Sequence, residues 1–122
     1  MAWVYEQSTG KLSHDGQFVA SGYAGKGAGK NNPQMEITPE TGPLPKGSYT
    51  ITGHPFHHPH TGAYSLRLSP HAGNRMYGRS GFLIHGDNVK HPGAASNGCI
   101  ILPLFVRKKI WSSGDKLLEV VK

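Results

Sequence analysis

Short apolar or alternating segments, separated by turns rich in glycine and proline, recur along the whole chain. In residues 63–68 apolar and polar side chains alternate, which is the two-residue period of a half-buried strand. The segments predicted as strands are 3–7, 17–21, 48–53, 63–68, 82–85 and 116–121. Residues 103–111 are predicted as a short helix, because proline opens the segment and Gly114 follows it.

Composition supports this pattern. The chain has 122 residues, of which 17 are glycine and 9 proline, and only 16% are charged. These values favour short strands and many turns over long helices. We therefore expect one domain over residues 1–122: a mainly β, compact sandwich or barrel with one short helix. Residues 22–32 are rich in glycine and lysine, but their spacing does not fit a phosphate-binding loop, and they are predicted to form a mobile surface loop.

The formal net charge of +6 indicates an acidic partner. Basic residues are scattered, and their one run, residues 107–109, lies near the end of the predicted helix, where it is interpreted as a solvated helix end. This distribution favours a polyanionic cell wall over nucleic acid. No apolar run approaches the ~20 residues that span a bilayer, so no membrane insertion is expected.

The candidate chemistry lies in two segments, Phe-Leu-Ile-His-Gly-Asp at 82–87 and Ser-Asn-Gly-Cys-Ile at 96–100. Cys99 is the only cysteine, and His85 precedes it by fourteen positions. A thiol nucleophile needs a base and donors for the developing oxyanion. Cys99 is predicted as nucleophile, His85 as base, and the backbone N–H groups of Gly98 and Cys99 as oxyanion donors. The alternative is an inert, buried cysteine, which is the commoner state of a lone free thiol.

Residues 81–102 resemble the active-site signature of the L,D-transpeptidases of the YkuD type. In that family a strand ends in His-Gly, and a loop leads to a Ser-His-Gly-Cys-(Ile/Val)-Arg-like segment. Residues 42–51 and 113–120 resemble two further family strands, so the likeness covers about residues 40–122. The segments 3–12 and 78–82 are similar to the small type VI secretion effectors built on this domain.

Two positions depart from that signature. Asn97 stands where most of the family has histidine, and Ile101 stands where most has arginine. Asn97 is expected to bond to the loop backbone. The missing arginine removes a charged anchor for the loop or for a substrate carboxylate, which disfavours ordinary cross-linking more than it disfavours thiol chemistry.

The resemblance implies an attack of Cys99 on the L,D bond between the third residue of a peptidoglycan stem and a terminal D-alanine, without a cofactor. The resemblance also implies that a small residue or a backbone carbonyl orients His85; Ser96 is the preferred candidate, and Asp87 is the second candidate. Substrate carboxylates are assigned to Arg79 and Tyr77, with Asp87 in the same substrate-contacting set. The alternatives are a solvent-facing turn for Arg79 and an Asx turn for Asp87.

The segment 54–60 holds four histidines and two prolines. Imidazoles ligate zinc or nickel, but the irregular spacing and the missing acidic partners disfavour a metal site. The segment is predicted to be a loop at the rim of the active site that acts as a lid. A metal-binding protein is kept as an alternative function.

The sequence predicts a peptidoglycan-modifying cysteine enzyme, an L,D-carboxypeptidase or D-amino-acid exchanger, that is an antibacterial type VI secretion effector. It lacks a recognisable signal peptide. We therefore expect synthesis in the cytoplasm, transport by secretion machinery, action in the periplasm of a target bacterium, and a periplasmic immunity protein. The alternatives are a housekeeping L,D-transpeptidase with a trimmed signal and an inactive wall-binding module.

Overall fold

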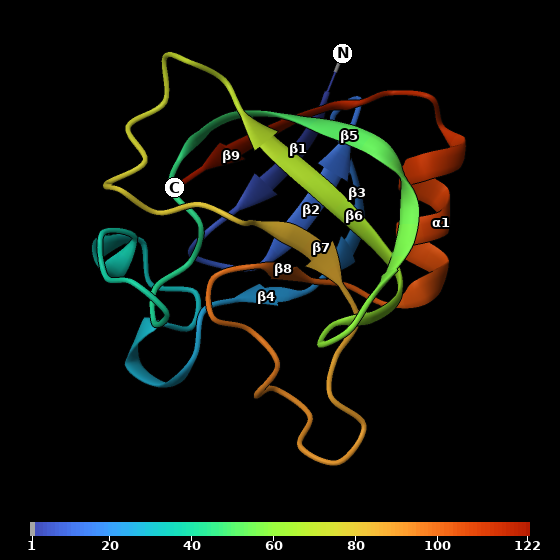
Figure 1. The fold of residues 1–122 in the computed structure, drawn as a ribbon. Helices are drawn as coiled ribbons and strands as arrows, with labels where there is room; N and C mark the ends of the chain where they lie inside the picture. Colours follow the sequence, from blue (N-terminus) through green and yellow to red (C-terminus); the bar gives the residue numbers. More distant parts are fainter. Residues whose placement is uncertain (1) are drawn as a thin grey trace.

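The computed structural model describes residues 2–122 (Figure 1). The described chain forms nine strands, one α-helix and two short 3-10 helices. The strands are β1 (Trp3–Glu6), β2 (Lys11–His14), β3 (Gln17–Ser21), β4 (Tyr23–Ala24), β5 (Gly47–His58), β6 (Gly62–Pro70), β7 (Leu83–His85), β8 (Ile100–Ile101) and β9 (Leu117–Val121). The helices are η1 (Gly27–Gly29), η2 (Pro33–Met35) and α1 (Leu104–Ser112). The expected mainly β protein with one helix after Cys99 is confirmed.

All nine strands belong to one sheet in the order β3-β2-β1-β9-β5-β6-β7-β8-β4. Its two outermost strands, β3 and β4, follow one another in the chain with only Gly22 between them, so the sheet curls back on itself like a barrel (Figure 1). Gly22 is required at this junction, because a Cβ there would lie 1.9 Å from the carbonyl oxygen of Ile101.

The hydrophobic core fills the inside of this curled sheet. It joins residues from the first strands, from the middle of the sheet and from α1 in one cluster that includes Trp3, Tyr5, Leu12, Tyr49, Leu66, Ile84, Ile100, Val106, Ile110 and Leu118. Their alternation along each strand explains the sequence pattern, since every second side chain points inward.

The structure corrects several predicted elements. Residues 11–14, 23–24 and 100–101 form strands that the sequence did not predict, and β5 continues to His58 instead of ending at residue 53. Residues 22–32 are not simply a surface loop. Gly25 and Gly29 are buried, and a Cβ on either would collide with the carbonyl oxygen of Thr41.

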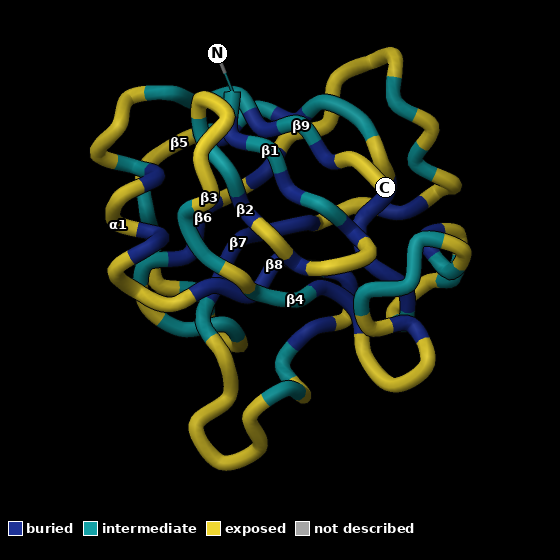
Figure 2. The backbone as a smooth tube through the Cα atoms, turned by 180° about the vertical axis from the view of Figure 1, so that it is seen from behind, coloured by how far each residue is buried: buried dark blue, intermediate teal, exposed yellow. Residues whose placement is uncertain are grey.

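Strands β7 and β8 position the candidate site. They are parallel neighbours, buried along their length (Figure 2), with Ile84 opposite Ile100 and His85 opposite Ile101. Parallel strands need a crossover connection, which here is the mostly exposed segment 86–99. No helix within the described residues 2–122 has the length and apolar character to cross a bilayer.

Candidate functional site

The pairing of β7 with β8 places Cys99 and His85 on the same face of the sheet. Cys99 directly precedes β8 and His85 ends β7. Because side chains alternate, Cys99 and Ile101 share the face that carries Leu83 and His85, opposite to the face of Ile84 and Ile100. The backbone N–H of Leu83 donates to the Cys99 Sγ at 3.3 Å. The strand register therefore places Cys99 and His85, which the sequence pairs by their motifs, on one face of the sheet.

A backbone carbonyl fixes the tautomer of His85. Its Nδ1 lies 2.8 Å from the carbonyl oxygen of Gly86. A carbonyl oxygen only accepts, so Nδ1 carries the proton and Nε2 has the free lone pair that a general base needs. The prediction that Ser96 or Asp87 orients this ring is wrong, because both side chains are bonded elsewhere.

Burial acts on both groups and favours their neutral forms. Burial raises the pKa of the Cys99 thiol, and the Leu83 N–H and the charge of Arg79 oppose this only in part. Burial lowers the pKa of the His85 imidazole below its usual range, helped by the charge of Arg107. The resting site thus holds a neutral thiol and a neutral imidazole on the same face of the sheet.

This pairing predicts how reactivity depends on pH. The base form of His85 is lost only as pH falls through its lowered pKa, so kcat/KM should stay level across neutrality and fall below about pH 6.5. Without substrate, alkylation of Cys99 by iodoacetamide should keep rising beyond about pH 9, because the thiol pKa is raised. If the alkylation rate of Cys99 instead levels off below neutral pH, the thiol is already ionised and paired with an imidazolium. That result would contradict a resting site in which both groups are neutral.

Ser96 organises the loop in front of Cys99. Its side chain is fully buried, accepts from the N–H groups of Gly25 at 2.8 Å and Gly98 at 3.0 Å, and donates to the carbonyl of Cys99 at 2.6 Å. Since Gly98 N–H is used by Ser96, the predicted role of Gly98 as an oxyanion donor is wrong. The N–H of Cys99, which lies beside its own sulfur, remains the candidate donor.

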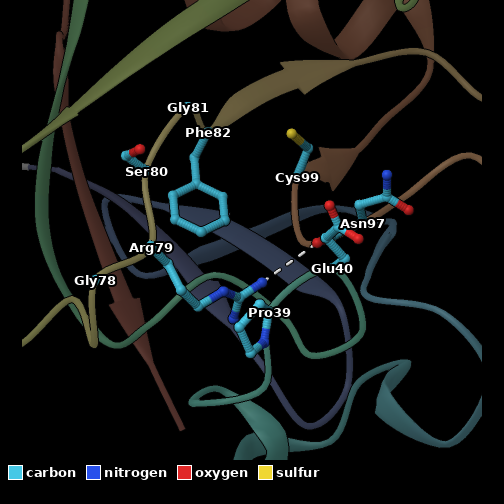
Figure 3. A pocket seen from close by; sticks show the side chains of 9 residues that line it. All are labelled: Pro39, Glu40, Gly78, Arg79, Ser80, Gly81, Phe82, Asn97 and Cys99. Atoms are coloured by element: carbon cyan, nitrogen blue, oxygen red, sulfur yellow. Dashed lines mark hydrogen bonds between the residues drawn. The ribbon is translucent and has the colours of Figure 1, made fainter.

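Cys99 opens onto a cavity of about 310 Å³, called here the thiol cavity (Figure 3). It is lined by Pro39, Glu40, Gly78, Arg79, Ser80, Gly81, Phe82, Asn97 and Cys99. A second cavity of about 310 Å³, the imidazole cavity, is lined by His60, Thr61, His85, Gly86, Asp87, Asn88, Ala94, Ala95 and Asn97. Asn97 borders both cavities. Its side chain is exposed, and within the described chain it makes none of the backbone hydrogen bonds expected from the sequence.

Arg79 is a buried clamp and not a free substrate ligand. Its side chain is only 8% exposed. Nη1 donates to the carbonyls of Glu36 and Pro43, and Nη2 donates to those of Gly42 and Asn97. Four of its five N–H donors are therefore used, which corrects both the predicted carboxylate fork and the alternative of a solvent-facing turn. Arg79 instead ties the wall formed by residues 36–43 to the catalytic loop.

Tyr77 also stabilises the wall formed by residues 36–43. Its hydroxyl donates to Glu36 Oε2 at 3.1 Å and does not line the thiol cavity, so its predicted substrate contact is not supported. The buried Glu36 carboxylate also accepts from Gln7, Lys46 N and Lys46 Nζ. Burial raises the pKa of Glu36, but these hydrogen bonds outweigh it and hold the pKa below its usual range.

Asp87 caps the crossover segment. Its carboxylate accepts from the Tyr23 hydroxyl at 2.6 Å and from the N–H groups of Asn88 and Gly93. This is the Asx-type capping that the sequence left as the alternative. Asp87 nevertheless lines the imidazole cavity, so a substrate contact there is kept as a prediction.

The sequence missed Arg107. Its side chain is 7% exposed, and it donates through Nε to the Leu102 carbonyl and through Nη1 to the carbonyls of Ala63 and Tyr64. The solvated helix end expected at residues 107–109 is wrong for this residue. The signal available in the sequence was its position: it follows Val106 and lies three residues before Ile110, both buried on the inner face of α1.

The histidine segment is a strand and turn, not the predicted loop. β5 reaches His58, whose Nδ1 accepts from the N–H groups of His60 and Thr61 at the turn into β6. His60 lines the imidazole cavity, so the segment does lie at the rim of the site. Between residues 2 and 122 no cluster of three or more histidine, cysteine or acidic side chains has a geometry that would hold a metal ion.

Comparison with known proteins places this chain in a family. A family model described as the Tlde1 domain matches residues 19–113, which is most of the chain. No curated protein sequence matches this chain. The crystal structure of Mycobacterium tuberculosis L,D-transpeptidase 1 is similar, with a TM-score of 0.53 and 20% sequence identity, over 99% of this chain and 61% of that one. This chain thus spans less than two thirds of that protein, and the likeness shows a shared fold.

Proposed function

The chain belongs to the Tlde1 domain family, the type VI secretion L,D-transpeptidase effectors, and on this premise we propose that it is an L,D-carboxypeptidase and D-amino-acid exchanger acting on peptidoglycan stems. We further propose that residues 1–122 form one catalytic domain. The observation that carries the proposal is the placement of Cys99 and His85 on one face of β7 and β8, each opening onto its own cavity.

In the first half of the reaction the stem lies in the thiol cavity. Cys99 Sγ attacks the carbonyl of the third residue while His85 Nε2 takes the thiol proton. The C–S bond forms, the C–N bond to D-alanine breaks, and His85 returns the proton to the departing amine. The N–H of Cys99 stabilises the oxyanion.

In the second half a nucleophile enters beside His85. Water or the amine of a D-amino acid attacks the thioester and gives a proton to His85, the C–S bond breaks, and the thiolate recovers that proton. The entering nucleophile is proposed to be small, because Ile101, which stands where the family signature has arginine, offers no charge to anchor a second stem.

Purified protein incubated with disaccharide tetrapeptides tests the reaction. Mass spectrometry should detect loss of one D-alanine, and with an added D-amino acid the corresponding exchanged peptide. Cross-linked dimers as the main product would overturn the preference for small nucleophiles. Unchanged peptides together with retained binding to sacculi would favour the inactive wall-binding module.

Delivery is tested by targeted expression in a susceptible Gram-negative bacterium. The proposed route is injection by a type VI secretion machine into the periplasm, with an acidic periplasmic immunity protein guarding the producer, because the effector carries a charge of +6. Fusion to an export signal should make the protein toxic, whereas expression in the cytoplasm should not. Equal toxicity from the cytoplasm would contradict periplasmic action, and periplasmic expression without toxicity would favour a housekeeping enzyme.

A further inference from the structure

The guanidinium of Arg107 is buried but only partly used by the protein. Nε and Nη1 hold the carbonyls of Leu102, Ala63 and Tyr64, at 2.9 to 3.1 Å. Nη2, in contrast, donates to no acceptor within residues 2–122, and it is not among the atoms sealed from solvent. It lies against Gly86, where a Cβ would be 2.7 Å away. Gly86 directly follows His85, and because it has no side chain it leaves room for the two free N–H donors of Arg107 Nη2.

These donors border a third cavity, called here the arginine cavity, of about 430 Å³. Ile101, Leu102, Pro103 and Leu104 give it an apolar wall, and Gly86 and Asp87 line it together with Arg107. Its volume is within the range of small-molecule sites, which combine apolar walls with a few fixed polar groups. Gly86 and Asp87 also line the imidazole cavity, so the two cavities adjoin.

The lining contains one charge of each sign. The free Nη2 of Arg107 can donate a charge-assisted hydrogen bond to a carboxylate, whereas the two-nitrogen fork is not available because Nε and Nη1 hold carbonyls. Burial raises the pKa of Asp87, but hydrogen bonds from Tyr23, Asn88 and Gly93 outweigh it and keep the pKa low, so Asp87 is ionised at neutral pH. A ligand with a carboxylate, an ammonium group and an apolar side chain matches this lining.

We propose that the arginine cavity binds a free α-amino acid with an apolar side chain, its carboxylate paired with Arg107, its ammonium group facing Asp87 and its side chain against Leu104. Gly86, which lines this cavity, directly follows His85 in the chain, and the acceptor of an exchange reaction is needed near that residue. Only its role as the acceptor site rests on the proposed function; the binding itself does not.

Calorimetric titration of the Cys99→Ala protein with D-leucine tests binding without turnover. D-leucinamide lacks the carboxylate, and N-acetyl-D-leucine lacks the ammonium group. Each should bind at least about tenfold more weakly than D-leucine, since a hydrogen bond to a charged group accounts for about that ratio. Equal affinity for D-leucine and its amide, or no saturable binding of D-leucine, would overturn the site.

Two variants locate the binding. Leu104 is 45% exposed at the start of α1, so Leu104→Trp is expected to fold and to fill the cavity, which should weaken D-leucine binding at least about tenfold. Phe105→Trp is the control, since Phe105 is 70% exposed and does not line the cavity. Equal binding by both variants would place the ligand elsewhere. D-leucine binding without any exchange activity would leave the site standing and refute the proposed exchange.

Discussion

Replacement of Cys99 by alanine is expected to abolish D-alanine release and exchange while leaving the fold intact. Cys99 is the only cysteine, and its sulfur accepts a single weak hydrogen bond from Leu83 N–H. Loss of a catalytic nucleophile reduces kcat by roughly 10⁴-fold or more. Mass-spectrometric rates on disaccharide tetrapeptides measure this effect, and the thermal midpoint should change little because alanine occupies the same half-buried position.

Val89→Ala is a matched control on the crossover segment before Cys99, because Val89 is 94% exposed and lines none of the three cavities. It should retain most of the activity. In the periplasmic assay, toxicity should disappear with Cys99→Ala and persist with Val89→Ala. Turnover by Cys99→Ala at the wild-type rate would refute the thiol mechanism, whatever the reaction product.

Arg79→Met is expected to cause the second large effect, a joint loss of stability and activity. The substitution leaves four backbone carbonyls in Glu36, Gly42, Pro43 and Asn97 without their donor. Loss of such a buried charged clamp costs about 3 kcal/mol of unfolding free energy. Because the clamp joins both walls of the thiol cavity, kcat/KM should fall by about 100-fold. Urea denaturation and peptide kinetics measure the two effects.

The pH profile of Cys99 alkylation distinguishes a purely structural role of Arg79 from an electrostatic one. The charge of Arg79 lowers the pKa of Cys99, so that pKa should rise further in Arg79→Met and less in Arg79→Lys, which keeps the charge but not the fork. Arg75→Met is the control, since Arg75 is exposed and its guanidinium lies over the ring of Tyr77. An Arg79→Met protein as stable and active as the wild type would show that the clamp is dispensable.

The fold class was predictable because its signals are local. Alternation of apolar side chains marked the longer strands, and Pro103 and Gly114 marked the ends of the helix segment. The two-residue strands β4 and β8 carry too few residues to show a period, so only pairing within the sheet reveals them. The histidines at the end of β5 follow no apolar alternation, so the strand through them was read as a loop.

The candidate catalytic pair, Cys99 and His85, could be chosen from the sequence for a different reason. Cys99 and His85 are recognised by the short motifs around them, which the chain carries in order. The hydrogen-bond partners of His85, Ser96 and Arg79 could not be predicted in the same way. These partners are mostly backbone atoms, and a sequence does not encode which carbonyl a side chain will meet. The carbonyl of Gly86 orients His85, a role that the sequence assigned to a side chain.

The sequence by itself therefore determined the class of fold and the choice of Cys99 and His85 as candidate nucleophile and base. The tertiary structure decided that Arg79 is a clamp, that Ser96 shapes the loop, and that Arg107 turns inward beside Gly86. The physical reason is that residue type and spacing specify local conformation and reactive groups. Burial, in contrast, depends on which distant segments pack together, and burial sets which donors are used, which are free, and the pKa values of Cys99 and His85.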